Sequence, residues 1–253
     1  SSSSFSSLPP PRRTLSASTS LSAGHFCASS TRAPPLPDAL AGILNSGVIA
    51  CLRARSGELA MEAAHAVLRG GISVLEVVMS TPGVLEVIRK LRQDYPSSII
   101  GVGTVLSSED ARNAVKAGAR FLMSPATIKE VLFDFQGEDV LYIPGVMTPT
   151  EVLGAYNSGA RIVKIYPASV LGGARYISVL KKPFFHIPMV ASQGITIDSI
   201  KTYIECGASA VVVSDAIFEK AAMTDGNYNE ICRLASYAAL QGAQAVKQRR
   251  ETC

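Results

Sequence analysis

Several residue types that mark particular classes of protein are scarce or absent in this sequence. Tryptophan does not occur among the 253 residues, and the three histidines form neither an HxH nor an HExxH pattern. Those spacings hold the metal in many zinc enzymes, so the sequence predicts no metal site. The chain also lacks the GxSxG turn of the α/β-hydrolases and a phosphate-binding P-loop. No apolar stretch reaches the roughly 18 residues of a membrane-spanning helix, so we expect no membrane partner.

Cysteine is present, but its spacing predicts no disulfide framework. The five cysteines are odd in number, widely separated and never arranged as CxxC: Cys27, Cys51, Cys206, Cys232 and Cys253. Small oxidised domains carry even sets of cysteines at close spacing. We therefore expect reduced thiols in a reducing compartment.

Excess positive charge is also lacking once the first part of the chain is set aside. The formal net charge is +4, and residues 1–36 contribute three arginines and no acidic residue. The remainder is therefore near +1, from 4 minus 3. A nucleic-acid-binding domain would show a basic stripe, so we expect no nucleic-acid partner.

Residues 1–36 have the composition of an organellar transit peptide. They are dominated by serine, with proline, alanine and threonine, and contain Arg12, Arg13 and Arg32. The high serine content favours targeting to a plastid. A secretory signal would need a continuous apolar segment, and residues 1–36 contain none. The alternative is a generic disordered tail. We predict a leader over 1–36, a folded domain over 37–253 and location in the chloroplast stroma.

From residue 37 onward, short apolar runs alternate with amphipathic helical runs. The apolar runs are nearly continuous in Val, Ile and Leu, as expected for parallel strands buried on both faces. The predicted strands are 47–53, 73–79, 99–104, 120–124, 140–144, 161–166, 187–191 and 210–213. The predicted helices are 57–69, 83–94, 108–117, 127–136, 149–158, 174–182, 197–206 and 227–248.

A sequence pattern in which a predicted helix ends at a glycine and a strand follows occurs four times, as RGGISVLEV, KAGARFLMS, NSGARIVKI and ECGASAVVV. Eight β/α units in this length favour an α/β fold of the (β/α)8 TIM-barrel type over an open doubly wound sheet. A short extra N-terminal helix at 37–45 is expected to cap the bottom of the barrel. The active site of such a barrel lies at the carboxyl ends of its strands.

Lys164 is the first candidate for chemistry at those strand ends. It interrupts the apolar sixth strand in the segment RIVKIYP. Burial disfavours the ammonium form and so supplies the neutral amine that attacks a carbonyl. The alternative is a lysine that reaches solvent or forms a salt bridge.

Glu76 is the only acidic residue within the apolar strand runs, in the second strand, SVLEVV. A buried carboxyl group can move protons near neutral pH. The alternative is that Glu76 is a structural counter-ion of Lys164 or Arg53.

Two further polar residues end predicted strands. Arg53 closes the first strand, and its planar guanidinium suits a substrate carboxylate, although a surface role is equally compatible with that position. Thr104 closes the third strand beside Gly101 and Gly103, which allow a ligand to approach the backbone. This GxG lacks the further glycine and the acidic residue of a dinucleotide-binding site.

Taken together, these segments resemble those of the 2-keto-3-deoxy-6-phosphogluconate (KDPG) and 4-hydroxy-2-oxoglutarate (KHG) aldolases. The resemblance extends over about 37–245. It is carried, in order, by VIACLRA (48–54), GGISVLEVVMSTPG (70–83), IIGVGTVL (99–106), AGARFLMSP (117–125), YIPGVMTPTE (142–151), VKIYPAS (163–169) and ASQGIT (191–196).

The resemblance implies a class I aldolase that acts on a small 2-oxo acid. Lys164 would form the Schiff base and Glu76 would act as general acid and base, with Arg53 and Thr104 binding the carboxylate. The other substrate-binding positions that it implies are Pro125, Gly172, Gly173, Ser192 and Gly194. The resemblance also implies a homotrimer, no metal and no organic cofactor, because the lysine forms the covalent imine itself.

This chain departs from the family pattern at three positions. Many members carry an arginine at the position of Ser80, and relatives without it typically have one at the position of Arg53. Members that cleave a 6-phosphate usually have glycine at the position of Gln193, and glycine or serine near Asp215. A carboxylate at Asp215 would repel a phosphate, by about 4 kcal/mol per charge pair at about 4 Å and an effective dielectric constant of about 20.

The sequence therefore predicts a Schiff-base lyase that cleaves a 2-oxo acid such as KDPG to pyruvate and an aldehyde. One alternative is the same imine chemistry on a non-phosphorylated substrate, as 4-hydroxy-2-oxoglutarate aldolase or oxaloacetate decarboxylase. Another is a non-catalytic barrel that binds a metabolite or a partner.

Overall fold

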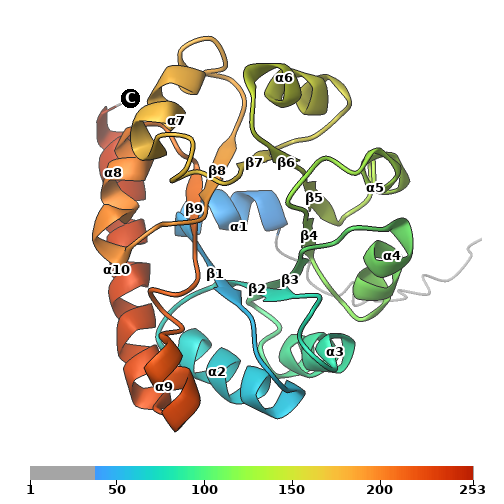
Figure 1. Cartoon of the computed structure of the whole chain (residues 1–253), viewed down its shortest axis with the longest axis vertical. Helices are drawn as coiled ribbons and strands as arrows, with labels where there is room; N and C mark the ends of the chain where they lie inside the picture. The colour runs from blue at the N-terminus through green and yellow to red at the C-terminus, as the bar shows by residue number, and fades with distance from the viewer. Residues whose placement is uncertain (1–37, 253) are drawn as a thin grey trace, which may run out of the picture. The chain divides into compact units, whose positions relative to one another are not determined.

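The apolar runs form a parallel sheet that closes into a barrel in the computed structural model, which describes residues 38–252. Neighbouring strands pair in the order β5-β4-β3-β2-β1-β9-β8-β7-β6. The strands are β1 (Val48–Leu52), β2 (Val74–Val78), β3 (Ile99–Gly103), β4 (Phe121–Met123), β5 (Leu141–Ile143), β6 (Gly145–Val146), β7 (Val163–Ile165), β8 (Met189–Ser192) and β9 (Ala210–Val213). The predicted TIM-barrel class is confirmed, and the open-sheet alternative is wrong (Figure 1).

The fifth predicted strand, 140–144, corresponds to β5, and a further strand that was not predicted, β6, follows directly, so nine strands are present instead of eight. β5 pairs with β4, β6 pairs with β7, and Pro144 lies between the two segments. Proline has no N–H to donate, but the Pro144 carbonyl still accepts a 2.8 Å hydrogen bond from the Lys164 amide. The segment 141–146 therefore pairs with β4 through its first part and with β7 through its last part, and so connects the two ends of the sheet.

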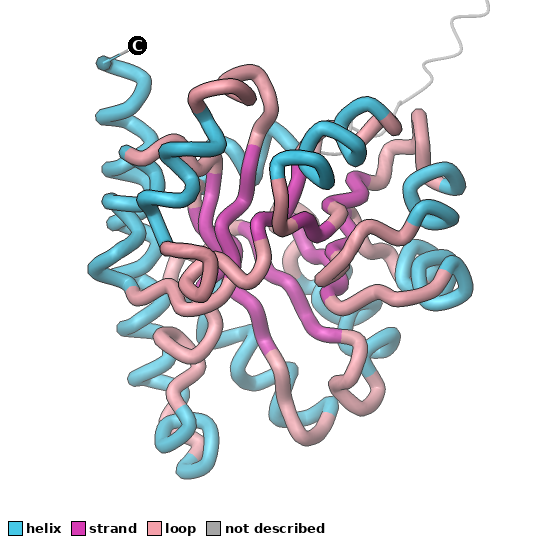
Figure 2. The backbone as a smooth tube through the Cα atoms, turned by 45° about the horizontal axis from the view of Figure 1, so that its top comes forward, coloured by secondary structure: helices cyan, strands magenta, loops and turns pink. Residues whose placement is uncertain are grey.

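The helices follow the strands and surround the sheet (Figure 2). They are α1 (Ala39–Ser46), α2 (Gly57–Arg69), α3 (Val84–Asp94), α4 (Ser108–Lys116), α5 (Lys129–Asp134), α6 (Pro149–Asn157), α7 (Gly173–Lys181), η1 (Ile197–Ser199), α8 (Ile200–Glu205), α9 (Lys220–Asp225) and α10 (Tyr228–Thr252). The short helix α9 was not predicted. The predicted helix at 197–206 begins as a 3₁₀ turn, η1, before α8.

Side-chain alternation along each strand separates two apolar cores. Outward-facing residues pack beneath the helices, while inward-facing residues such as Ile49, Val74 and Phe121 fill the barrel. The predicted N-terminal helix is α1, which packs Ala39 and Ile43 against the interior set and lies across the barrel opening in Figure 1. The amino-terminal half of the barrel is therefore filled with apolar side chains, which leaves the opposite end for chemistry.

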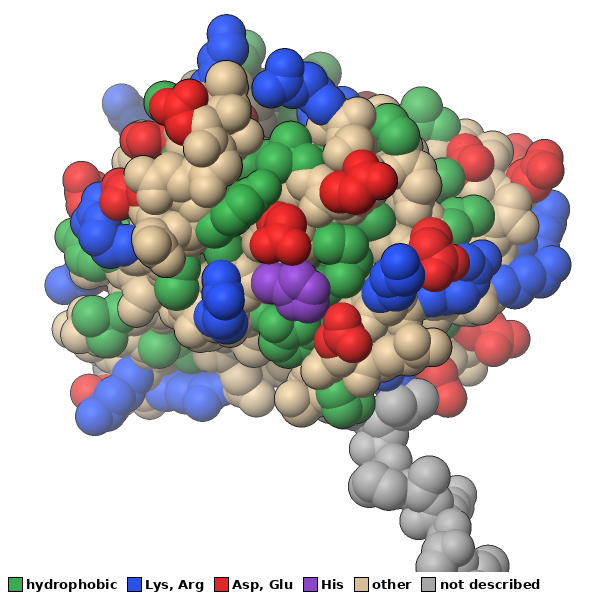
Figure 3. All heavy atoms as spheres, turned by 90° about the horizontal axis from the view of Figure 1, so that it is seen from below, with side chains coloured by type: hydrophobic (Ala, Val, Ile, Leu, Met, Phe, Trp, Pro, Cys, Tyr) green, Lys and Arg blue, Asp and Glu red, His purple; other side chains and the backbone are tan. Residues whose placement is uncertain are grey.

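Surface charge and thiols can be described for residues 38–252. Figure 3 shows acidic, basic and hydrophobic side chains interspersed over one face, without a basic stripe on that face. Cys51, Cys206 and Cys232 are free thiols. Cys27, Cys253 and the leader predicted at 1–36 lie outside the described residues. Between residues 38 and 252, no helix is both long and apolar enough to cross a membrane.

Candidate active site

Lys164 points into the barrel because it alternates with Val163 and Ile165, which pack outward beneath the helices. Its side chain is buried, with 7% of the residue exposed. The ammonium nitrogen Nζ lies 5.3 Å from the centre of the Tyr166 ring, within cation–π range. None of the ion pairs formed by the described residues includes Lys164. The salt-bridged alternative for this lysine is therefore wrong.

Glu76 enters the same interior from β2 and is 1% exposed. Gly103 on the neighbouring strand makes room for it, since a Cβ built on Gly103 would lie 1.6 Å from Glu76 Oε1. The other carboxylate oxygen, Oε2, is buried without a hydrogen-bond partner. No ion pair within 4.0 Å joins Glu76 to Lys164 or Arg53 in the described part of the chain, so Glu76 is not a counter-ion in this state. A buried acceptor left unpaired is costly, which is typical of a functional group.

Both residues line one cavity of about 730 Å³ at the carboxyl ends of the strands. The cavity also contains seven residues that the sequence singled out, five as substrate-binding and two as departures from the family pattern. These are Arg53, Thr104, Pro125, Ser192, Gln193, Gly194 and Asp215. Strands far apart in the sequence thus bring most of the predicted site together.

Arg53 and Ser80 are adjacent in space, although they are 27 residues apart in the sequence. Arg53 Nη1 donates a 2.8 Å hydrogen bond to Ser80 Oγ. The Arg53 guanidinium, just after β1, therefore reaches Ser80, just after β2, which is the position where many family members have their arginine. Arg53 lines the cavity and is exposed there, which is compatible with the anion-binding role that the resemblance implies for its guanidinium.

Two cavity residues that are not glycine adopt left-handed backbone conformations. Thr104 has φ of 58° and Gln193 has φ of 87°. Such conformations cost of order 1–3 kcal/mol for residues with a Cβ and cluster at functional sites. Gln193 occupies a position where the family has glycine, and its side-chain oxygen accepts a hydrogen bond from Ser169 Oγ. The substitution therefore retains the backbone shape at the cost of strain and adds an exposed side chain.

Gly172 and Gly173 are the predicted site residues that do not line this cavity. Their amides donate to Ser169 O and Ala168 O, at 3.4 and 2.9 Å, at the start of α7. Both hydrogen bonds lie within the β7–α7 loop. The geometry therefore gives no support to the phosphate-binding role predicted for these two glycines.

Three of the cavity-lining residues that sequence reasoning missed make contacts that bear on the site: Tyr166, Ser214 and Cys51. Tyr166 follows Lys164 by two positions and lies against its ammonium group. Ser214 Oγ donates a 2.8 Å hydrogen bond to the carbonyl of Cys51, and both residues face the cavity. Cys51 alternates with Ile49 and Arg53 along the chain, so it could have been expected to face the same side of the strand. A cysteine in an apolar strand is, however, usually an ordinary core residue.

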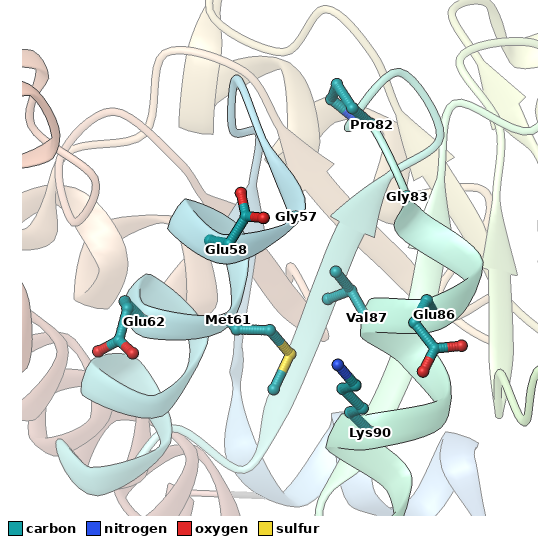
Figure 4. A pocket seen from close by; sticks show the side chains of 9 residues that line it. All are labelled: Gly57, Glu58, Met61, Glu62, Pro82, Gly83, Glu86, Val87 and Lys90. Atoms are coloured by element: carbon teal, nitrogen blue, oxygen red, sulfur yellow. The ribbon is translucent and has the colours of Figure 1, made fainter.

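A second hollow, of about 540 Å³, lies between α2 and α3 (Figure 4). Met61 and Val87 form its apolar part, and the side chains of Glu58, Glu86 and Lys90 surround it. These charged groups are exposed, so none of them is desolvated for chemistry. The hollow shares no residue with the barrel cavity, which remains the candidate active site. Among the described residues, no His, Cys, Asp and Glu side chains gather as a metal site.

A parallel barrel with a buried lysine and a buried carboxyl group at its carboxyl end defines a carbon–carbon lyase of the Schiff-base class. Residues 42–234 match the family described as KDPG and KHG aldolase, and the chain belongs to this family.

Curated relatives support this assignment. A 2-dehydro-3-deoxy-phosphogluconate aldolase of Treponema pallidum is 34% identical over 63% of this chain and 79% of its own length. The corresponding enzyme of Pseudomonas aeruginosa is 31% identical over 69% of this chain and 80% of its own length. The KHG/KDPG aldolase of Escherichia coli K12 is 28% identical over 80% of this chain and 95% of its own length.

Solved structures show the same fold. The KDPG aldolase of Legionella pneumophila, with pyruvate captured as a covalent carbinolamine, has a TM-score of 0.73 and 28% identity. The similarity covers 78% of this chain and 96% of that one. The family thus forms a covalent intermediate with pyruvate and needs no organic cofactor for it.

Proposed function

We propose that this chain is a class I aldolase that cleaves KDPG to pyruvate and a phosphorylated aldehyde. The observation that carries the proposal is the placement of Lys164 and Glu76, both buried and neither paired with the other, in one cavity with Arg53 at its edge. The relatives named above are aldolases, which favours aldol cleavage over oxaloacetate decarboxylation and over a non-catalytic barrel.

The residues divide the reaction between them. The amine of Lys164 attacks the C2 carbonyl of the substrate, and Glu76 moves protons as the carbinolamine forms and loses water. The protonated imine accepts the electron pair when the C3–C4 bond breaks, the C4 hydroxyl gives its proton to the Glu76 carboxylate, and an aldehyde leaves. Glu76 then protonates C3 of the enamine, and hydrolysis releases pyruvate and restores the lysine. Arg53 and Thr104 hold the carboxylate.

Borohydride trapping tests the imine directly. Pyruvate plus borohydride is expected to modify the purified protein covalently at Lys164, since reduction converts the Schiff base to a stable amine. Peptide mapping locates the adduct, and Lys164→Ala is the matched control. A wild-type protein that gives no adduct, or an adduct that persists in Lys164→Ala, would refute the proposed mechanism.

The substrate tail has a second candidate, because two cavity residues disfavour a phosphate. Gln193 adds a side chain where glycine exposes an amide, and the exposed carboxylate of Asp215 also lines the cavity. These features support weak preference, or none, for a 6-phosphorylated substrate over 4-hydroxy-2-oxoglutarate. Comparing kcat/KM for the two compounds on one preparation decides between them.

A homotrimer belongs to the same proposal. Large apolar side chains are exposed on three loops that follow strands at the cavity end: Leu106 after β3, Met147 after β6 and Val170 after β7. Val170 is 75% exposed, and a subunit interface over these loops would remove its side chain from water. Light scattering after size exclusion should give three times the chain mass, and a monomeric mass would refute the trimer.

Plastid targeting by residues 1–36 completes the proposal and rests on their composition alone. Fused to a fluorescent protein in plant cells, these residues should direct it to chloroplasts. Uniform cytosolic fluorescence would favour the disordered-tail alternative.

A further inference from the structure

We propose that Cys51 is a positioning residue whose thiol donates a hydrogen bond to the Glu76 carboxylate and so holds the general acid–base in its working orientation. The inference rests on the proposed aldolase function and adds a residue to which the resemblance gives no role.

The barrel register brings Cys51 and Glu76 together. The two residues are directly paired across the neighbouring strands β1 and β2, and both side chains face the interior. Cys51 packs against the interior apolar set and also lines the cavity, so its thiol lies at the boundary between the two. Its backbone is held from the other side, because Ser214 Oγ donates to its carbonyl at 2.8 Å.

The charge environment keeps this thiol protonated and therefore a donor. Burial raises the pKa of Cys51 well above its usual value, and the negative charge of Glu76 raises it further. Lys164 and Arg53 act in the opposite direction but do not outweigh these effects. At neutral pH the group is S–H, which is a donor to a carboxylate rather than a nucleophile.

Glu76 is short of such donors. Gly103 leaves a slot for Oε1, and Oε2 is buried without a hydrogen-bond partner. Without a donor, a carboxylate enclosed by strands would be free to rotate. The Cys51 thiol on the paired strand would donate one hydrogen bond to the Glu76 carboxylate. The remaining acceptor positions of the carboxylate would stay available for the substrate.

Three variants separate a positioning role from mere packing. Cys51→Val removes the donor at similar volume, Cys51→Ser keeps a donor, and Cys51→Ala removes both donor and bulk. In Cys51→Val, kcat for cleavage is expected to fall roughly three- to tenfold, the kinetic equivalent of one modest hydrogen bond, while KM is unchanged.

Cys51→Ser is expected to keep kcat and KM near their wild-type values, whereas Cys51→Ala should behave like Cys51→Val. Cys206→Val, which removes a half-buried thiol at the end of α8, is the control and should leave both unchanged. Thermal melts identify any variant that is unfolded, in which case the Ala variant replaces the Val variant.

Two results would overturn the inference. One is a Cys51→Val enzyme with the wild-type kcat, and the other is a Cys51→Ser enzyme as impaired as Cys51→Val. Failure of the aldolase proposal is distinguishable, since pyruvate trapping at Lys164 would then be absent in the wild-type protein.

Discussion

Gly103 offers the sharpest test of how the barrel positions Glu76. Replacing it with alanine places a methyl carbon 1.6 Å from Glu76 Oε1 and 2.8 Å from Glu76 Cγ, provided nothing moves. The strand backbone is held by parallel pairing to β2 and β4, so the glutamate side chain must yield. Gly103→Ala should therefore displace the carboxylate without removing it.

The expected magnitudes differ for stability and for catalysis. Overpacking of one methyl group in a filled interior costs roughly 1–3 kcal/mol, which a folded barrel of this size can tolerate. A general acid–base contributes about 10²–10⁴-fold to turnover, and its displacement should lose a large part of that. Gly103→Ala is thus expected to remain folded while kcat falls about 100-fold.

The assay compares three glycine variants, each corrected for its folded fraction by a thermal melt. In Gly101→Ala, on the same strand and paired with Glu76 across β2 and β3, the new methyl carbon meets the Phe121 ring at 2.4 Å, so it overpacks a different side chain. In Gly154→Ala, within α6, it meets nothing within 4 Å. Gly101→Ala should lose stability but keep kcat, and Gly154→Ala should lose neither. If Gly101→Ala loses as much kcat as Gly103→Ala, general loosening of the barrel, and not displacement of Glu76, is the cause.

The remaining predictions concern three other places. Glu76→Gln should fold and still bind pyruvate but lose roughly 10²–10⁴-fold in kcat, and near wild-type turnover would make Glu76 structural only. The double variant Gln193→Gly, Asp215→Ser should lower the KM for KDPG with pyruvate trapping unchanged, whereas an unaltered KM would place Asp215 away from the phosphate. Thr148→Ala removes the hydroxyl that caps α6 and bonds Glu151, so urea unfolding should show a loss of about 0.5–2 kcal/mol. An unchanged unfolding free energy would show that water replaces this cap.

The sequence alone was sufficient for the fold class and for selecting two charged residues that lie buried inside the barrel. Continuous apolar runs at regular spacing, separated by glycine-terminated helices, specify parallel strands buried on both faces. A single lysine and a single glutamate within such runs are conspicuous because an unpaired charge is expensive to bury. Their inward direction follows from strand alternation, which the apolar neighbours Val163 and Ile165 already define.

Only the tertiary structure decided how these residues meet. The break at Pro144, the space above Gly103 and the pairing of Cys51 with Glu76 depend on strands that are far apart in the sequence. The positive φ of Gln193 likewise could not be predicted from the sequence, because a glutamine normally adopts a negative φ. Local periodicity determines which way a side chain points. What lies opposite it depends on the register and closure of the barrel, which are set by contacts between distant segments.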